Sequence, residues 1–131
     1  MKNKRIIGYA YVVGDILHFG HIQHLKNCKA LCDKLIVGVL TDEACMEKKP
    51  KPSIRFKERM EIIAELKSVD AAIVQDTYSP FNNVINTKPN ILFESSSHDK
   101  IMSREGLKVI IMPYFPDQSS TKIKEVIRGN S

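Results

Sequence analysis

Hydrophobic residues in this chain gather into five short runs that are rich in isoleucine and valine. Within each run most positions are apolar, whereas a strand with one solvent-exposed face would alternate apolar and polar residues. Continuous runs of this kind are typical of parallel strands that are covered on both faces. The predicted strands are Arg5–Val13, Lys34–Leu40, Ala71–Gln75, Asn90–Glu94 and Lys108–Met112.

The segments between these runs carry apolar residues at helical spacing. In the first segment Ile22, Leu25 and Cys28 fall on one side of a helix, and Ser53 is a candidate N-cap for the second. Strands that alternate with helices predict a three-layer α/β fold with a five-stranded parallel sheet. The predicted helices are Gly20–Cys32, Ile54–Leu66, Pro80–Asn86 and Ser119–Arg128.

The composition is that of a soluble globular protein of one domain, with 131 residues, 43% hydrophobic and 27% charged. The longest uncharged, mostly apolar run, Ile6–Gly14, has nine residues. A membrane-spanning helix needs ~20, so we expect no membrane insertion. The three cysteines include no Cys-x-x-Cys pair, which argues against a disulfide scaffold or a thiolate zinc site. Reduced thiols indicate a reducing compartment, and we expect the protein in the cytoplasm.

Positive charge is concentrated after the second predicted strand. The chain has 20 Lys and Arg against 15 Asp and Glu, a net charge of +5, and six basic residues fall within twelve positions. Too few aromatic side chains interleave with them to form a stacking surface for bases, so we expect no nucleic acid and favour a small polyphosphate ligand. The six residues are Lys48, Lys49, Lys51, Arg55, Lys57 and Arg59.

Ligands of such folds bind beyond the carboxyl ends of the strands, where the predicted loops are Val13–His21, Thr41–Ser53 and Pro113–Thr121. In the first loop Gly20 permits a close turn, and His18 and His21 lie beside the amides that open the first predicted helix. Two imidazoles next to these amides make a site for an oxyanion, above all a phosphate. The alternative is zinc bound with His24, but successive His-x-x-His steps turn by ~60° on a helix and converge poorly.

The segment His18-Phe19-Gly20-His21 fits the HxGH signature of the nucleotidyltransferase superfamily related to class I aminoacyl-tRNA synthetases. Three further features match in the same order: Val37–Glu43, the basic positions Lys48 and Arg59, and Ser119–Ile123. Over nearly its whole length the chain resembles the cytidylyltransferase branch and is most similar to bacterial glycerol-3-phosphate cytidylyltransferase.

This resemblance implies a Rossmann-like fold and a single cytidylyltransferase-like domain over residues 1–131. It implies an enzyme that transfers CMP from CTP to a small phosphorylated or phosphonate acceptor and releases pyrophosphate, with Mg²⁺ held largely by triphosphate oxygens and water. It also implies a homodimer. The implied catalytic residues are His18, His21 and Lys48. The implied nucleotide-binding residues are Val13, Gly14, Asp15, Gly20, Arg59, Ser119, Ser120 and Thr121.

Several of these residues have plainer alternatives. Lys48 can be one solvated lysine among several. Arg59 can pair with Glu58, Glu61 or another carboxylate instead of a phosphate. The Ser119–Thr121 cluster can serve only as a helix cap.

Three segments depart from the pattern of the resembling family. Val12–Asp15 stands where relatives usually read Gly-Thr-Phe-Asp, Tyr114–Thr121 lacks the arginine of an RTxG segment, and Glu94–Asp99 replaces a GDDW-like stretch. These changes indicate altered ligand selection and leave two alternatives open: an ATP-using adenylyltransferase of the same superfamily, or a non-catalytic nucleotide-binding module. The residues of the replaced stretch that are candidates for acceptor or base recognition are Ser96, Ser97 and His98.

Overall fold

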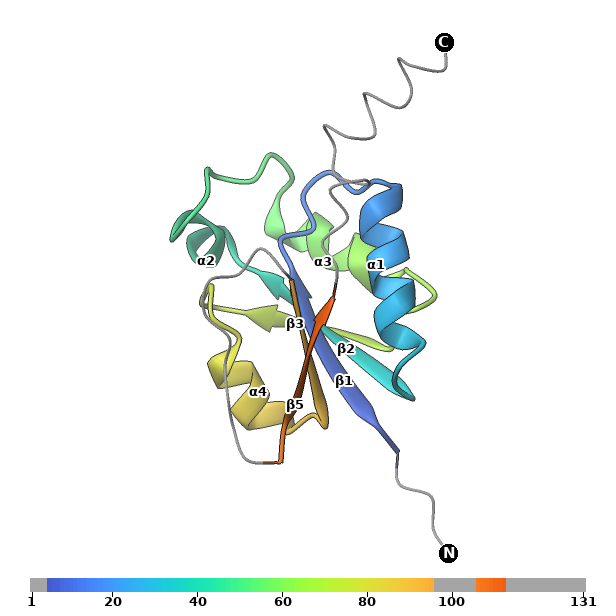
Figure 1. Ribbon diagram of the computed structural model, residues 1–131. Helices are drawn as coiled ribbons and strands as arrows, with labels where there is room; N and C mark the ends of the chain where they lie inside the picture. The colour runs from blue at the N-terminus through green and yellow to red at the C-terminus, as the bar shows by residue number, and fades with distance from the viewer. Residues whose placement is uncertain (1–4, 96–105, 113–131) are drawn as a thin grey trace, which may run out of the picture.

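The computed structural model describes residues 5–95 and 106–112 (Figure 1). Its five strands are β1 (Ile7–Val12), β2 (Lys34–Leu40), β3 (Ala71–Gln75), β4 (Ile91–Ser95) and β5 (Lys108–Met112). Its helices over the same residues are α1 (Phe19–Lys29), α2 (Asp42–Met46), α3 (Phe56–Ala64) and α4 (Phe81–Thr87).

All five strands pair in parallel, in the order β3-β2-β1-β4-β5. The helices α1 and α3 cover one face of the sheet, and α4 lies on the opposite face (Figure 1). The predicted three-layer, Rossmann-like α/β fold with a five-stranded parallel sheet is therefore confirmed. The chain runs outward from β1 to β3 and then returns to β4 beside β1, which places the switch in strand order between β1 and β4. Ligands of open parallel sheets bind at such a switch.

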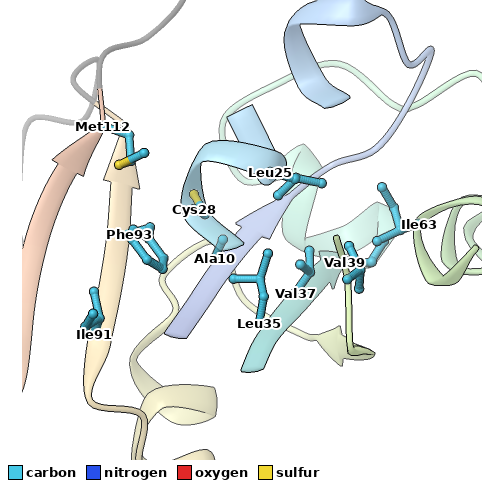
Figure 2. Packing of buried hydrophobic residues seen from close by; sticks show 11 residues of the cluster. Ala10, Leu25, Cys28, Leu35, Val37, Val39, Ile63, Ile91, Phe93 and Met112 are labelled. Atoms are coloured by element: carbon cyan, nitrogen blue, oxygen red, sulfur yellow. The ribbon is translucent and has the colours of Figure 1, made fainter. Parts of the chain in front are cut away.

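Two apolar clusters fix the helices to the sheet. On one face, Leu25 and Cys28 of α1 and Ile63 of α3 pack on Val37 of β2 and Phe93 of β4, together with further buried residues (Figure 2). All five are almost entirely shielded from solvent. This burial holds the N-terminus of α1 above the carboxyl ends of β1 and β2.

On the other face, Tyr9, Val84 and Leu92 form a smaller cluster. The phenol of Tyr9 hydrogen-bonds Gln75 and accepts a hydrogen bond from the amide of Asn83. Its oxygen occupies the space that a Cβ at residue 38 would fill, so Gly38 is required where β2 passes this tyrosine. The face towards α4 is thus built around a hydrogen-bonded buried tyrosine.

Most predicted element bounds agree with the structure to within one or two residues, but two expectations were wrong. The N-cap of α3 is Arg55, with no side-chain hydrogen bond, rather than Ser53. The segment Thr41–Ser53 is not all loop, because it contains α2, whose N-cap Thr41 accepts a hydrogen bond from the amide of Ala44 at 3.0 Å. The predicted helix Ser119–Arg128 and the loop Pro113–Thr121 lie outside the described residues.

The cysteines Cys28, Cys32 and Cys45 are free thiols. Burial raises the pKa of the Cys28 thiol to about 12, so it stays protonated and packs as a small apolar side chain. Among the residues that the structure describes, no helix is both long and apolar enough to span a bilayer.

Candidate functional site

The N-terminus of α1 is capped by two histidines that hold each other in place. His18 is the N-cap residue, and its Nδ1 accepts a hydrogen bond from the amide of Gly20 at 3.0 Å. The Nδ1 of His21 accepts from the amide of His18 at 3.2 Å, so the two side chains form a reciprocal capping box. The ring centroids are 4.1 Å apart. The capping box therefore explains why His18 and His21 are three residues apart: this is the spacing between an N-cap residue and position N3.

This arrangement fixes which ring nitrogens carry protons. An imidazole nitrogen that accepts a hydrogen bond from an amide carries no proton, so each neutral ring carries its proton on Nε2. The pKa of His21 is lowered to about 4, first because burial disfavours the cation and then because of the charges of His18, His24 and Lys49. At neutral pH His21 is therefore an uncharged donor. Two Nε2–H groups beside the positive end of the α1 dipole form a donor cluster for a phosphate.

The loop that leads from β1 to these histidines is held by Gly14 and Asp15. Gly14 is buried with a φ of +73°, a left-handed conformation that favours glycine, and a Cβ there would approach Ile63 to 3.3 Å. The carboxylate of Asp15 accepts hydrogen bonds from the amides of Ser53 at 3.0 Å and Ile54 at 2.9 Å. These contacts fasten the loop to the chain segment that precedes α3.

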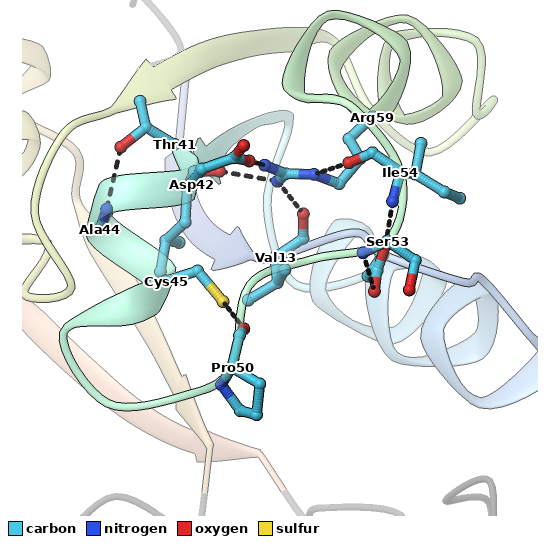
Figure 3. Close-up of polar contacts among 11 residues, drawn as sticks. Val13, Thr41, Asp42, Ala44, Cys45, Pro50, Ser53, Ile54 and Arg59 are labelled. Carbon is cyan, nitrogen blue, oxygen red and sulfur yellow. Dashed lines mark hydrogen bonds and ion pairs between the residues drawn. The ribbon is translucent and has the colours of Figure 1, made fainter.

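Arg59 is fully buried and donates to four oxygens (Figure 3). Its Nε donates to the carbonyl of Ile54 at 2.9 Å, and its Nη1 donates to the carbonyls of Val13 at 2.6 Å and Leu40 at 2.7 Å. Its Nη2 pairs with the carboxylate of Asp42 at 2.6 Å. The guanidinium therefore joins the ends of β1 and β2 to α2 and α3.

This geometry favours the alternative that Arg59 pairs with a carboxylate. The partner is Asp42 rather than Glu58, which instead forms an ion pair with Arg55 at 2.9 Å. Direct binding of a phosphate by Arg59 stays a prediction. The contacts in the structure give this residue a positioning role, because they draw together the strand ends on which the site is built.

The segment between α2 and α3, residues 47–54, is called here the basic loop. It leaves α2 with the amides of Lys48 and Lys49 both donating to the carbonyl of Cys45. The Nζ of Lys48 lies 5.4 Å from the ring centroid of Tyr78, within the range of a cation–π contact. The loop passes over the carboxyl ends of the strands before it reaches α3 (Figure 1).

The structure brings the first-loop and basic-loop candidates to one end of the sheet. Val13 contributes its carbonyl to Arg59, and Gly20 is buried in the first turn of α1. His24 turns towards its own helix, with Nε2 3.8 Å from the sulfur of Cys28. Within residues 5–95 and 106–112, no cluster of three or more His, Cys, Asp or Glu is arranged to hold a metal ion. The predicted residues Ser96, Ser97, His98, Ser119, Ser120 and Thr121 lie outside the described residues.

Sequence reasoning missed Asp42 as the partner of Arg59. A signal was present, because Thr41 is followed by two acidic residues, as at the start of many helices. A helix of five residues is too short to show a helical periodicity of apolar residues, so the sequence alone does not reveal that Asp42 lies in a helix.

Comparison with known proteins identifies the family. The family model described as cytidylyltransferase-like matches residues 14–126. The chain belongs to the cytidylyltransferase-like family. The predicted membership of the nucleotidyltransferase superfamily is thereby confirmed, whereas a specific likeness to glycerol-3-phosphate cytidylyltransferase is not shown.

Named members of the superfamily align with most of this cytidylyltransferase-like chain. It is 32% identical over 120 residues to the bifunctional protein HldE of Campylobacter fetus subsp. fetus, covering 88% of this chain but only 26% of HldE. It is 32% identical over 127 residues to the FAD synthase of Methanosarcina mazei, covering 87% of this chain and 83% of that enzyme. The crystal structure of a lipopolysaccharide core biosynthesis protein from Thermoplasma volcanium GSS1 superposes with a TM-score of 0.74 at 31% identity, covering 85% and 97% of the two chains.

Proposed function

We propose that the protein transfers a nucleotidyl group from a nucleoside triphosphate to a small acceptor that carries a phosphate or phosphonate. An acceptor oxygen forms a bond to the α-phosphorus, the bond from the α-phosphorus to the bridging oxygen breaks, and pyrophosphate leaves with the electron pair. Such a reaction needs positioning and charge stabilisation rather than a covalent enzyme intermediate. The observation that carries the proposal is the histidine capping box, whose two Nε2–H donors stand at the N-terminus of α1.

In this proposal His18 and His21 hold the bridge between the α- and β-phosphates. Both rings are already oriented by their Nδ1 hydrogen bonds, so they need little reorganisation when charge develops on the leaving group. The Nε2–H group of an imidazole is a hydrogen-bond donor whether or not the ring carries a second proton. The basic loop supplies positive charge from the other side of the site, where the sequence resemblance gives this role to Lys48.

Two triphosphates are candidates for the donor. ATP is favoured by the similarity to the FAD synthase of Methanosarcina mazei, since FAD contains AMP joined to a flavin phosphate. CTP is favoured by the description of the family as cytidylyltransferase-like and by the resemblance of the motifs. A homodimer is proposed from the resemblance alone.

Mg²⁺ would enter with the triphosphate as part of the substrate. The carboxylates of Asp15 and Asp42 lie close to the site, but the first accepts from two backbone amides and the second pairs with Arg59. The residues present therefore fit a metal held by phosphate oxygens and water better than one held in a protein cage.

The proposal is tested by measuring pyrophosphate release with ATP, CTP and the other nucleoside triphosphates against a panel of phosphorylated alcohols and phosphonates. We expect release with one nucleotide and one class of acceptor. Calorimetry with each nucleotide separates the alternatives, because binding without turnover on a broad panel would identify a non-catalytic nucleotide-binding module. Neither binding nor turnover would contradict the proposed function.

A further inference from the structure

Gln75, the last residue of β3, is buried and uses its side-chain amide inside the protein. Its Nε2 donates to the carbonyls of Thr77 at 3.0 Å and Tyr78 at 3.2 Å, and its Oε1 accepts from the phenol of Tyr9. A carbonyl oxygen can only accept, so the amide nitrogen must face residues 77 and 78 and the amide oxygen must face Tyr9. Both N–H groups are therefore used to organise the chain that follows β3.

The orientation of this amide is fixed by the elements around it. A Cβ at residue 38 of β2 would approach the Oε1 of Gln75 to 2.7 Å, so Gly38 leaves the space that the amide occupies. Asn83 of α4 donates to the oxygen of Tyr9 and to the carbonyl of Val74, each at 2.8 Å. A buried network of this kind favours one arrangement of its members, because any other leaves polar groups unsatisfied. The two N–H groups of Gln75 thus have a fixed direction.

The segment that receives these two hydrogen bonds also contacts the start of the basic loop. The amide of Tyr78 donates to the carboxylate of Glu47 at 3.3 Å, and the ring of Tyr78 lies 5.4 Å from the Nζ of Lys48. The hydroxyl of Thr77 donates to the carbonyl of Ser79 at 2.7 Å, which tightens the same turn. A continuous set of contacts therefore joins the buried amide of Gln75 to the first two residues of the basic loop.

We propose that Gln75 is a positioning residue for nucleotidyl transfer: its two hydrogen bonds hold Tyr78 as the seat from which Lys48 reaches the triphosphate. This inference rests on the proposed function, in which the family resemblance gives Lys48 its catalytic role. Lys48 is exposed, and a free lysine side chain has many rotamers. Holding its ammonium against a fixed ring reduces the entropy that is lost when the nucleotide binds. Gln75 acts only through Tyr78 and the basic loop.

NMR of the free protein tests the first step of this proposal without any substrate. Protons over the face of an aromatic ring resonate upfield, so the side-chain signals of Lys48 report whether it is seated on Tyr78. We expect this upfield shift in the wild type and in Tyr78→Phe, which keeps the ring. We expect its loss in Tyr78→Leu and in Gln75→Met, which keeps the length of the side chain but has no N–H donor.

Asn83→Ala is the matched control, because it removes two hydrogen bonds of the same network without touching residues 77 and 78. It should keep the upfield shift of Lys48. Should Gln75→Met not fold, Gln75→Glu answers the same question, since it keeps the acceptor for Tyr9 and lacks both donors. Retention of the shift in a folded Gln75 variant would overturn the proposal.

A double-mutant cycle for turnover tests the second step, with the nucleotide and acceptor that the wild type uses in the pyrophosphate assay. Gln75→Met should lower kcat about tenfold and change KM by less than about threefold, because it weakens transition-state stabilisation rather than uniform binding. In the Lys48→Ala background the same substitution should lower kcat by less than about twofold, since the group through which Gln75 acts is already gone. Asn83→Ala should keep the kcat of the wild type.

The outcomes separate this inference from the proposed function. An equal loss of kcat from Gln75→Met in both backgrounds would show that Gln75 only supports the fold, which would overturn the inference and leave the proposed function standing. A wild-type protein that turns over no nucleotide would contradict the proposed function, while the NMR signals of Lys48 would still decide whether Gln75 seats this side chain.

Discussion

The histidine capping box and the buried Arg59 lie at the same end of the sheet, yet they use their hydrogen-bond donors in opposite ways. The box is local: two rings three residues apart satisfy each other through Nδ1 and keep Nε2–H for a ligand. Arg59 is long-range: its donors are used by oxygens up to 46 residues away in sequence. A charged residue at a site is therefore not by itself a ligand-binding residue, and its partners decide whether it binds or positions.

The largest effect is expected from Arg59→Met, which removes the cation and leaves Asp42 and three carbonyl oxygens without their donor. Loss of this partly buried ion pair together with the three hydrogen bonds to carbonyls should cost about 3–5 kcal/mol. Urea denaturation should show this loss in the free energy of unfolding, and Arg59→Lys should recover only part of it. An unchanged unfolding free energy together with lost nucleotide binding would instead assign Arg59 to the phosphate.

In the histidine capping box, His18→Ala and His21→Ala should each lower turnover by about 10²- to 10³-fold, as does removal of one donor to a transition-state oxyanion. His18→Asn separates catalysis from capping, because asparagine is a good N-cap but lacks the Nε2–H donor. We expect this variant to keep the stability of the wild type and to lose turnover. His24→Ala is the control, and full activity in the His18 and His21 variants would remove both from the mechanism.

Asp15 connects the two regions, because it belongs to the loop that leads to the capping box and accepts hydrogen bonds from the two amides that precede α3. Asp15→Ala leaves the amides of Ser53 and Ile54 without their acceptor and should cost about 1–3 kcal/mol of stability. In this variant, amide hydrogen exchange at residues 53 and 54 should be faster than in the wild type, whereas exchange in α1 should change less. Unchanged exchange there would contradict the role of Asp15 in fastening the basic loop.

The last effect, which vanishes at neutral pH, is a pH dependence of stability that comes from His21. Its folded-state pKa is lowered to about 4 from an ordinary value of 6.5, so the unfolded chain binds more protons between these two values. The stability contribution is therefore complete above pH 6.5 and is lost as pH falls towards 4. Urea midpoints measured across this window should fall less steeply with acid in His21→Gln than in the wild type. Identical slopes would show that His21 is not protected from protonation.

The sequence predicted those parts of the molecule whose signals are local. The bounds of β2, β3 and β5 agree with the prediction because buried parallel strands read as unbroken apolar runs. His18, Gly20 and His21 were recognised because the box closes within four residues. The contacts of Arg59 could not be predicted in the same way, since three of its four acceptors are backbone carbonyls, which every residue carries. The contact of Lys48 with the ring of Tyr78 joins residues that are 30 positions apart in sequence, and it forms only through folding.

The central claim is that the two imidazoles at the start of α1 hold the polyphosphate of a nucleotide. It is tested most directly by titrating ¹⁵N-histidine-labelled protein with ATP and with CTP. The account predicts large shifts of the Nε2 signals of His18 and His21 at saturation, while the signals of His24 stay in place. Saturable nucleotide binding that leaves both of these rings unperturbed would contradict it.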